Sequence, residues 1–307
     1  MGSFSRFVAA VDRSTGLTLK ILVTGASSMI GEFLLPMLVD AGYEVVVTSR
    51  THHVAQYGVR WLQLDFMHDQ WAESVGEVDL WVNLTSILLL PGLLPGCLTS
   101  LKVKRLMAFS STSKFTKKDA KSEQDRQLAE ALDAAEGDVR ACCEENGVDW
   151  VIFRPTMIYC LNRDKNISLI VEKIRRFHFF PLISSGCGLR QPVHAEDLAQ
   201  ACVQAIGSEG IANKGYNLSG GEVLSYRAMV ERLFECLGMR AVLVPVPLGL
   251  LRMCIALLRI FPRYRYLSAD MADRMRRDMV FSHEEASRDF GYSPGPFRPL
   301  LKRGAGD

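Results

Sequence analysis

Short apolar runs alternate with segments in which apolar residues recur every three or four positions. The first run, at 21–23, is followed by a helical pattern that begins at Ile30. Further runs lie at 45–48, 61–66, 78–85, 103–111 and 152–159. Continuous apolar runs of this length are typical of strands that are buried on both faces, as in parallel sheets. The alternation therefore predicts an α/β fold with a doubly wound parallel sheet.

The same patterns predict how the chain is divided. We expect an N-terminal extension over 1–17, a sheet domain formed mainly by 18–240, and a smaller discontinuous lobe from 160–185 and 241–307. The most apolar late segment, 248–261, is too short to span a membrane and contains two arginines. It favours a helix packed in the small lobe; the alternatives are a helix at a membrane surface and a face that docks a partner.

Composition narrows the functional classes. The 307 residues carry a net charge of +2, so bulk electrostatics favour neither a nucleic-acid nor a membrane partner, and we expect no transmembrane segment. The eight cysteines include no CxxC pair, which indicates reduced thiols and no metal site. Residues 1–20 lack the apolar core of a secretory signal. We expect a cytoplasmic protein.

The most informative local pattern lies at 20–31, where a strand, a glycine turn and a helix follow one another. This order directs free backbone N–H groups and a helix N-terminus at a pyrophosphate. Gly25 allows the turn, and Gly31 lets the helix approach the strand. Ser28 stands where a second glycine is usual, which weakens the match. The pattern predicts a dinucleotide site.

Residues 24–31 read TGASSMIG and resemble the TGxxGxxG fingerprint of extended and atypical short-chain dehydrogenases/reductases, in particular the NAD-dependent epimerase/dehydratase branch. The resemblance covers nearly the whole chain and implies a Rossmann-like domain, a smaller C-terminal substrate lobe and an NAD or NADP cofactor. The cofactor-binding residues that it implies are Gly25, Ser27, Ser28, Met29, Ile30, Gly31, Asp65, Phe66, Leu84, Thr85, Ser110, Arg154, Pro155 and Thr156.

The choice of cofactor depends on the residue that closes the second strand. An acidic side chain there binds the ribose 2′-hydroxyl of NAD, whereas an arginine accommodates the 2′-phosphate of NADP. This chain has Arg50 at that point and no Asp or Glu. We therefore predict that NADP is preferred over NAD.

The catalytic residues that the resemblance implies are only partly present. The strand end at 110–113 reads SSTS, and Thr112 matches the hydroxyl that binds the reacting oxygen in the family. The family's proton shuttle is a tyrosine followed four residues later by a lysine, on one helix face. Those positions fall on Leu128 and Leu132, and no tyrosine occurs between Tyr57 and Tyr159. The chain resembles atypical members that lack the dyad.

Two arginines are candidate substrate contacts by resemblance. Arg190 lies in a segment that resembles GxGxRxxxHVxDLA, whose arginine contacts the pyrophosphate of nucleotide sugars. An ion pair with Glu196 or Asp197 is an equally good interpretation of Arg190. Arg274 is the nearest match to a second phosphate-contacting arginine.

Two hypotheses of different classes follow. The first is an atypical extended short-chain dehydrogenase/reductase that binds NADP(H) and acts as an oxidoreductase or an epimerase/dehydratase-like enzyme. Its substrate would be a small molecule or a nucleotide sugar bound between the lobes. The alternative is a non-catalytic dinucleotide-binding regulator or accessory subunit, similar to an accessory subunit of respiratory complex I. A homodimer or a protein partner is compatible with both.

Overall fold

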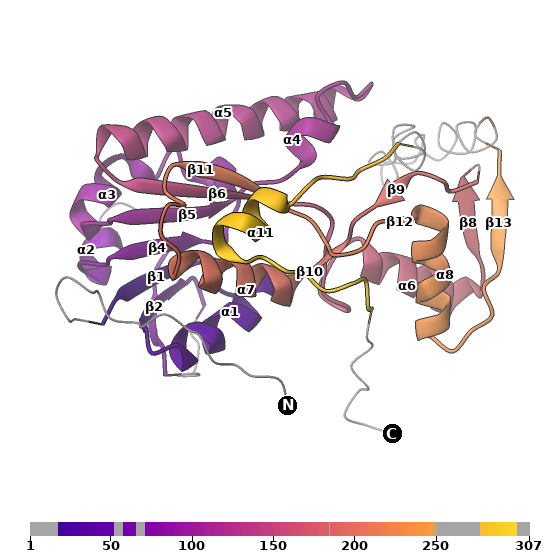
Figure 1. Ribbon diagram of the computed structural model, residues 1–307, viewed down its shortest axis with the longest axis horizontal. Coiled ribbons are helices and arrows are strands. Elements are labelled where there is room, and N and C mark those ends of the chain that lie inside the picture. Colours follow the sequence, from indigo (N-terminus) through magenta and orange to yellow (C-terminus); the bar gives the residue numbers. More distant parts are fainter. Residues whose placement is uncertain are drawn as a thin grey trace.

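Seven parallel strands form the central sheet. The computed structural model describes residues 18–51, 58–65, 71–183, 185–247, 249 and 277–299. The strand order is β11-β6-β5-β4-β1-β2-β3 (Figure 1). The strands are β1 Lys20–Thr24, β2 Glu44–Ser49, β3 Arg60–Gln63, β4 Leu80–Asn83, β5 Arg105–Phe109, β6 Asp149–Pro155 and β11 Lys214–Leu218. The predicted doubly wound parallel sheet is confirmed.

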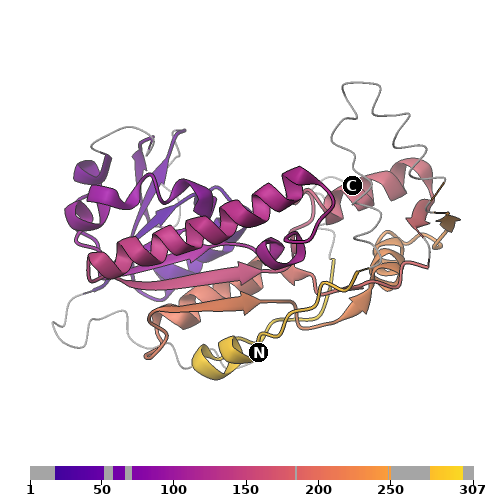
Figure 2. The ribbon, with the colours of Figure 1, turned by 90° about the horizontal axis from the view of Figure 1, so that it is seen from above.

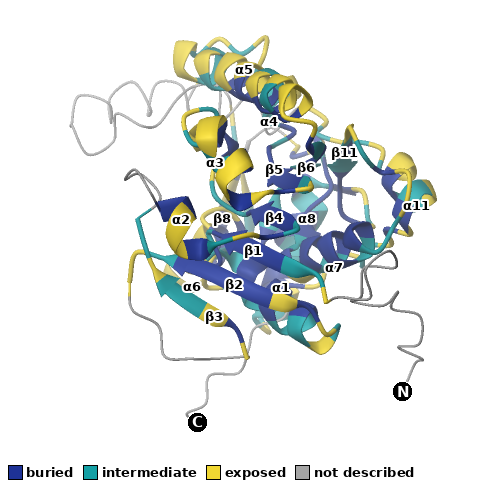
Figure 3. Cartoon of the chain, turned by 90° about the vertical axis from the view of Figure 1, so that its left-hand side faces the viewer, coloured by how far each residue is buried: buried dark blue, intermediate teal, exposed yellow. Residues whose placement is uncertain are grey.

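Helices cover both faces of the sheet (Figure 3). One face carries α1 (Met29–Asp40), α7 (Ala195–Ile206) and α11 (Glu284–Phe290), and the other carries α2 (Trp71–Val75), α3 (Leu94–Leu101) and α5 (Glu123–Glu145). Two short helical turns, η1 (Ile87–Leu89) and α4 (Ser113–Thr116), follow the ends of β4 and β5. Ile21 and Val23 pack into the first core and Leu22 into the second, because side chains alternate along a strand.

A smaller lobe has its own apolar core. It contains α6 (Ile167–Phe177), α8 (Tyr226–Cys236) and a parallel pair of strands, β8 (Phe180–Ile183) with β13 (Leu243–Val246). The buried residues of α6 recur at helical spacing and face those of α8: Ile167, Ile170, Val171 and Ile174 against Met229, Val230, Leu233 and Phe234. Two short strand pairs lie beside the lobe, namely β7 (Ile158–Tyr159) with β10 (Val193–His194) and β9 (Leu189–Arg190) with β12 (Leu224–Ser225).

The C-terminal segment 277–299 joins the two parts. It starts beside β9, crosses to the large domain, where α11 packs on β11 and α7, and then returns to the small lobe (Figures 1 and 2). Its last part buries Phe297 in the small-lobe core against the ring of Tyr159, at 5.0 Å between centroids. The backbone N–H of Arg298 donates to the Tyr159 hydroxyl at 3.1 Å.

The predicted division of the chain needs two corrections. Helix α8, which was assigned to the large domain, packs in the small lobe because its apolar face fits that of α6. Helix α11, which was assigned to the small lobe, packs on the large domain, where Ala286 and Phe290 join the core. The predicted extension 1–17 and all of the segment 248–261 except Gly249 lie outside the described residues. Within the described ranges, no helix combines the length and apolarity needed to cross a bilayer.

Truncating Phe297 tests whether the returning segment stabilises the small lobe. Phe297→Ala removes a side chain that is 1% exposed, and we expect the free energy of unfolding to fall by about 3–5 kcal/mol in chemical denaturation. Val280→Ala is a matched control, because Val280 lies in the same segment but is 39% exposed. We expect that change to be within about 0.5 kcal/mol of the parent. Equal effects of the two substitutions would contradict the assignment.

Candidate functional site

The candidate site lies at the carboxyl ends of β1 and β4. The strand order reverses between these two strands, and ligands of open α/β sheets bind in the crevice at such a point. A buried hydrogen-bond network joins the two ends. Thr24 Oγ1 donates to Asn83 Oδ1 at 2.8 Å, Thr85 Oγ1 donates to the same oxygen at 2.7 Å, and Trp81 Nε1 donates to Thr24 Oγ1 at 3.0 Å. The network fixes Thr85 beside the glycine turn.

The turn requires glycine at two positions. Gly25 has a φ of +74°, and a Cβ there would lie 2.7 Å from Cγ2 of Thr85. A Cβ on Gly31 would lie 2.0 Å from the carbonyl oxygen of Ala26. These distances are too short for any side chain. Glycine at positions 25 and 31 is therefore what lets the turn form and α1 pack this close to the sheet.

Ser28 needs no glycine conformation. Its φ of −68° is ordinary for an L-residue, and its Oγ accepts a hydrogen bond from the Gly31 N–H at 3.2 Å as the N-cap of α1. The departure from the fingerprint therefore introduces no backbone strain at this position. Among the described residues, the N–H groups of Met29 and Ile30 have no hydrogen-bond partner. They are free donors at a helix N-terminus, an arrangement that suits an anion.

The residues predicted for the adenosine end lie along the neighbouring strand ends. Arg50 directly follows β2 and is exposed, and its carbonyl accepts from Nε2 of Gln63 at 3.4 Å. Asp65 is half-buried after β3, and Leu84 and Thr85 are half-buried after β4. Phe66 lies outside the described residues, as does Arg274.

A cleft of about 790 Å³ lies between the large domain and the small lobe. Four predicted site residues line it: Met29, Thr112, Thr156 and Arg190. Its lining also includes four further cations and one carboxylate: Lys117, Arg163, Lys165, Lys173 and Asp164. The carboxylate of Asp164 accepts from the N–H groups of Asn166 and Ser168, at 2.9 and 3.0 Å. The excess of cations indicates an anionic ligand.

Arg163 links the small-lobe side of the cleft to the glycine turn. Its Nη2 donates to the carbonyl oxygen of Ser27 at 2.7 Å, and its Nη1 is paired with Glu32. The guanidinium therefore lies beside the free donors of α1. Sequence reasoning missed this residue, because it lies in an irregular stretch after β7 where no periodicity singles it out.

The hydroxyl of Thr112 is already engaged. It donates to the carbonyl oxygen of Pro155 at 3.1 Å, so in this conformation its oxygen can only accept from a ligand. On α5, Leu132 is buried in the core of the α2–α3–α5 face and Leu128 packs against the same core. The two positions predicted for the family's proton shuttle are thus packing residues, and α5 contains neither a tyrosine nor a lysine.

A buried carboxylate was missed by the sequence reasoning. Glu136 is fully buried on α5 and accepts from Ser110 Oγ at 2.6 Å and from Lys114 Nζ at 2.7 Å. The guanidinium of Arg154 binds it from two nitrogens, at 2.8 to 3.1 Å. Burial alone would raise the pKa of Glu136, but these hydrogen bonds outweigh it and hold the pKa below its ordinary value. Glu136 follows Leu132 by four residues on an otherwise apolar helix face, and this was the signal available in the sequence.

The network shows what Ser110 and Arg154 contact in this structure. Both had been predicted to bind the cofactor by resemblance, and both direct their polar groups at Glu136. The guanidinium of Arg154 occupies space that depends on Gly215, where a Cβ would lie 2.6 Å from Nη2. The network therefore ties α5 to the ends of β5 and β6.

Arg190 is 3% exposed at the cleft wall. Its Nη1 donates to the carbonyl oxygens of Leu189 and Arg277, at 2.7 and 2.8 Å. Its guanidinium carbon lies 5.5 Å from the centroid of the Tyr226 ring. These contacts hold a cation at the cleft surface in a fixed orientation.

Comparison with known proteins identifies a family. Residues 21–87 and 93–219 match the model of the NAD dependent epimerase/dehydratase family. Protein y4nG of Sinorhizobium fredii is 26% identical over 49% of this chain and 37% of its own length. Chloroplast stem-loop binding protein of 41 kDa b of Arabidopsis thaliana is 21% identical over 69% of this chain and 61% of its own length. The chain thus spans less than two thirds of either of these relatives.

Solved structures share the fold along nearly the whole chain. UDP-glucuronic acid 4-epimerase from Bacillus cereus, in complex with UDP-glucuronic acid and NAD, superimposes with a TM-score of 0.70 at 15% identity, covering 91% of this chain and 95% of its own. UDP-glucose 4-epimerase from Thermotoga maritima, with UDP-glucose, gives 0.67 at 16% identity, with 90% and 94% covered. MoeE5 with UDP-glucuronic acid and NAD gives 0.68 at 18% identity, with 91% and 94% covered.

Replacing Glu136 tests the buried network. Glu136→Gln leaves Lys114 and Arg154 facing a neutral amide, and we expect the free energy of unfolding at neutral pH to fall by about 3–5 kcal/mol. Because the folded-state pKa of Glu136 is lowered, its charge stabilises the fold above the ordinary carboxyl pKa. The difference between parent and variant should therefore shrink as the pH falls through that lowered pKa.

Glu130→Gln is the matched control, since Glu130 is an exposed carboxylate on the same helix. We expect a change below about 0.5 kcal/mol at every pH. A Glu136→Gln protein as stable as this control in denaturant titrations would contradict the role assigned to the network.

Proposed function

The chain belongs to the NAD-dependent epimerase/dehydratase family of extended short-chain dehydrogenases/reductases, and on this premise we propose that it binds NADP(H) and acts as an atypical oxidoreductase or epimerase/dehydratase-like enzyme. Its substrate is an anionic small molecule or a nucleotide sugar. The observation that carries the proposal is the pair of free N–H groups at the start of α1, which lie beside a cleft lined by cations. The predicted cytoplasmic location remains part of the proposal.

The turn at 24–31 fits a dinucleotide. Its diphosphate would accept from the N–H groups of Met29 and Ile30, with the N-terminus of α1 as a favourable field. Arg50 would pair with a 2′-phosphate, Asp65 and Phe66 would border the adenine, and the strand end at Leu84 would run beside the cofactor. When bound, the nicotinamide supplies hydride transfer. NAD is bound by the Bacillus cereus epimerase, and the preference of this chain for NADP rests on Arg50 alone.

The cleft fits an anionic substrate. Arg190 presents a fixed guanidinium at its wall, and Lys165 and Lys173 add charge from the small lobe. A diphosphate would be bound by such a group through paired N–H donors. The Thermotoga maritima and Bacillus cereus epimerases bind UDP-sugars, which supports a nucleotide-linked ligand in this chain. Arg274 remains a proposed second contact.

The chain's own residues limit the proton chemistry. Leu128 and Leu132, at the positions that the resemblance gives to the tyrosine and lysine, pack in or against the core, and we expect no proton transfer from them. Thr112 offers an acceptor oxygen in the cleft and would orient a hydroxyl of the substrate rather than shuttle its proton. A proton donor or acceptor would have to come from the cleft lining, which includes Lys117 and Asp164.

A non-catalytic dinucleotide-binding protein, a regulator or an accessory subunit, is the second candidate. The observation that favours it is the apolar packing of Leu128 and Leu132 at the positions of the proton shuttle. Both candidates share the cofactor site, so they differ in turnover and not in dinucleotide binding.

Calorimetric titration with NADPH, NADP, NADH and NAD tests the cofactor site. We expect tighter binding of the phosphorylated pair, and about a ten-fold loss of that preference in Arg50→Ala, because a charge-assisted contact to the 2′-phosphate is removed. Arg60→Ala is the control, since Arg60 is exposed at the opposite, amino end of β3 and should change nothing. Failure of all four dinucleotides to bind would overturn the proposal.

Arg190→Lys tests the substrate site. The variant keeps the charge but loses the planar, paired donors, and we expect weaker binding of UDP-glucuronic acid with NADPH affinity unchanged. Retained NADPH binding shows that the fold is intact. Unaltered affinity for the nucleotide sugar, or no affinity in the parent, would exclude Arg190 as its phosphate contact.

A further inference from the structure

The outer end of the small lobe combines exposed apolar and basic side chains. Ten large apolar side chains are exposed among the described residues, and four of them lie at the end of α6, on β13 or directly beside β8 and β13: Phe177, Phe179, Val242 and Val244. These elements form the end of the molecule that is farthest from the large domain, at the right of Figure 1. Exposed apolar side chains that gather in one place mark an interaction site.

Five consecutive residues at the end of α6, 175–179, are all exposed, and we call them the basic–aromatic tip. They read Arg-Arg-Phe-His-Phe. The rings of Phe177 and Phe179 lie 6.1 Å apart, and the guanidinium of Arg176 lies 5.3 Å from the ring of Phe177. His178 has a φ of +61°, which ends the helix and turns the chain into β8.

The outer face of the β8–β13 ribbon extends this surface. Val244 lies opposite Pro181 in the parallel register, and Val242 and Phe179 directly precede the first paired residues of the two strands. All four side chains are exposed, so the face is apolar along its length. Phe180 and Leu182, which alternate with them, are buried in the small-lobe core.

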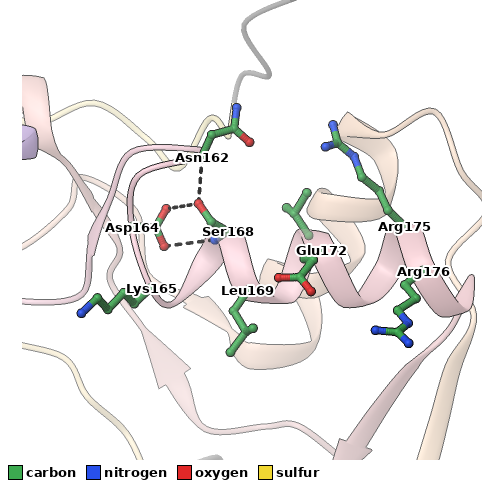
Figure 4. A pocket seen from close by; sticks show the side chains of 9 residues that line it. Asn162, Asp164, Lys165, Ser168, Leu169, Glu172, Arg175 and Arg176 are labelled. Carbon is green, nitrogen blue, oxygen red and sulfur yellow. Dashed lines mark hydrogen bonds between the residues drawn. The ribbon is translucent and has the colours of Figure 1, made fainter.

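Cations surround the apolar face. Arg175, Arg176 and Arg240 are exposed, and among the described residues no carboxylate lies within salt-bridge distance of any of the three. Arg175 and Arg176 leave the end of α6 in different directions (Figure 4). Both line an open groove of about 750 Å³ along the outer face of this helix, together with Lys165. Glu172 is the one acid between residues 165 and 179.

We propose that the basic–aromatic tip and the outer face of the β8–β13 ribbon bind the surface of an anionic lipid bilayer. Phenylalanine and valine side chains would enter the boundary between headgroups and acyl chains, while Arg175, Arg176 and Arg240 would remain among the lipid phosphates. The protein would attach to the bilayer by this outer end of the small lobe (Figure 1).

The charge pattern favours this occupant over the alternatives. A two-fold dimer through the same surface would bring two arginine-rich copies together, with Glu172 as the one acid that each copy offers between residues 165 and 179, which is unfavourable. Single-stranded nucleic acids stack their bases on aromatic rings, and the aliphatic side chains of Val242 and Val244 offer no such platform. A bilayer accepts aromatic and aliphatic side chains alike.

Sedimentation of the full chain with vesicles tests the proposal without any dinucleotide or substrate. We expect binding to vesicles of phosphatidylcholine mixed with phosphatidylglycerol, little binding to phosphatidylcholine alone, and weaker binding as salt is added. Removing two charges in Arg175→Gln/Arg176→Gln should lower the partition coefficient roughly thirty-fold. Phe177→Ala/Phe179→Ala should lower it about ten-fold or more.

Leu88→Ala/Leu89→Ala is the matched control, because it removes two exposed apolar side chains from the large domain. It should bind vesicles like the parent, and circular dichroism should show all variants folded. The proposal is overturned if the parent ignores anionic vesicles or if the tip variants bind as it does. It is also overturned if the tip variants lose only binding to a stem-loop RNA, or only self-association in analytical ultracentrifugation.

Discussion

The close approach of α1 to the ends of β1 and β4 is the constraint on which the candidate site depends. Thr85 is held by Asn83 against Gly25, and Gly31 lies against the carbonyl of Ala26 with no room for a Cβ. A larger side chain at either glycine would push the helix away from the sheet. Because the helix is held there, its first two free N–H groups point out at the place where the strand order reverses. The turn thus packs α1 against the sheet and leaves two N–H donors of the helix without a partner among the described residues.

The buried Glu136 imposes a second constraint beneath the cleft. A carboxylate at zero exposure is unfavourable unless hydrogen bonds and opposite charges compensate it, and here Ser110, Lys114 and Arg154 do so. The network ties α5 to the ends of β5 and β6. It also withdraws polar groups from the cleft, because the side chains that could have faced a ligand face Glu136 instead.

The small net charge of the chain conceals an uneven distribution. Cations gather in the small lobe along α6: Lys173 lines the cleft, and Arg175 and Arg176 line the groove that adjoins the cleft at Asp164, Lys165 and Leu169. The buried stripe of the helix anchors it on α8 and leaves these cations on its other side. One helix therefore supplies charge to both the cleft and the groove. The returning C-terminal segment fixes this lobe against the large domain, since Phe297 completes its core.

The sequence by itself determined the sheet, its glycine turn and the family resemblance, because apolar runs, helical spacing and required glycines are local properties of the chain. It also showed that two leucines, Leu128 and Leu132, stand at the positions where the resemblance predicts a tyrosine and a lysine. Only the tertiary structure decided where α8 and α11 pack, because either lobe could have accepted their apolar faces. It likewise decided that Ser110 and Arg154 serve Glu136 and that Arg163 reaches Ser27, since these contacts join residues 18 to 136 positions apart. A contact over such separations depends on how the strands and helices are arranged, which no local pattern records.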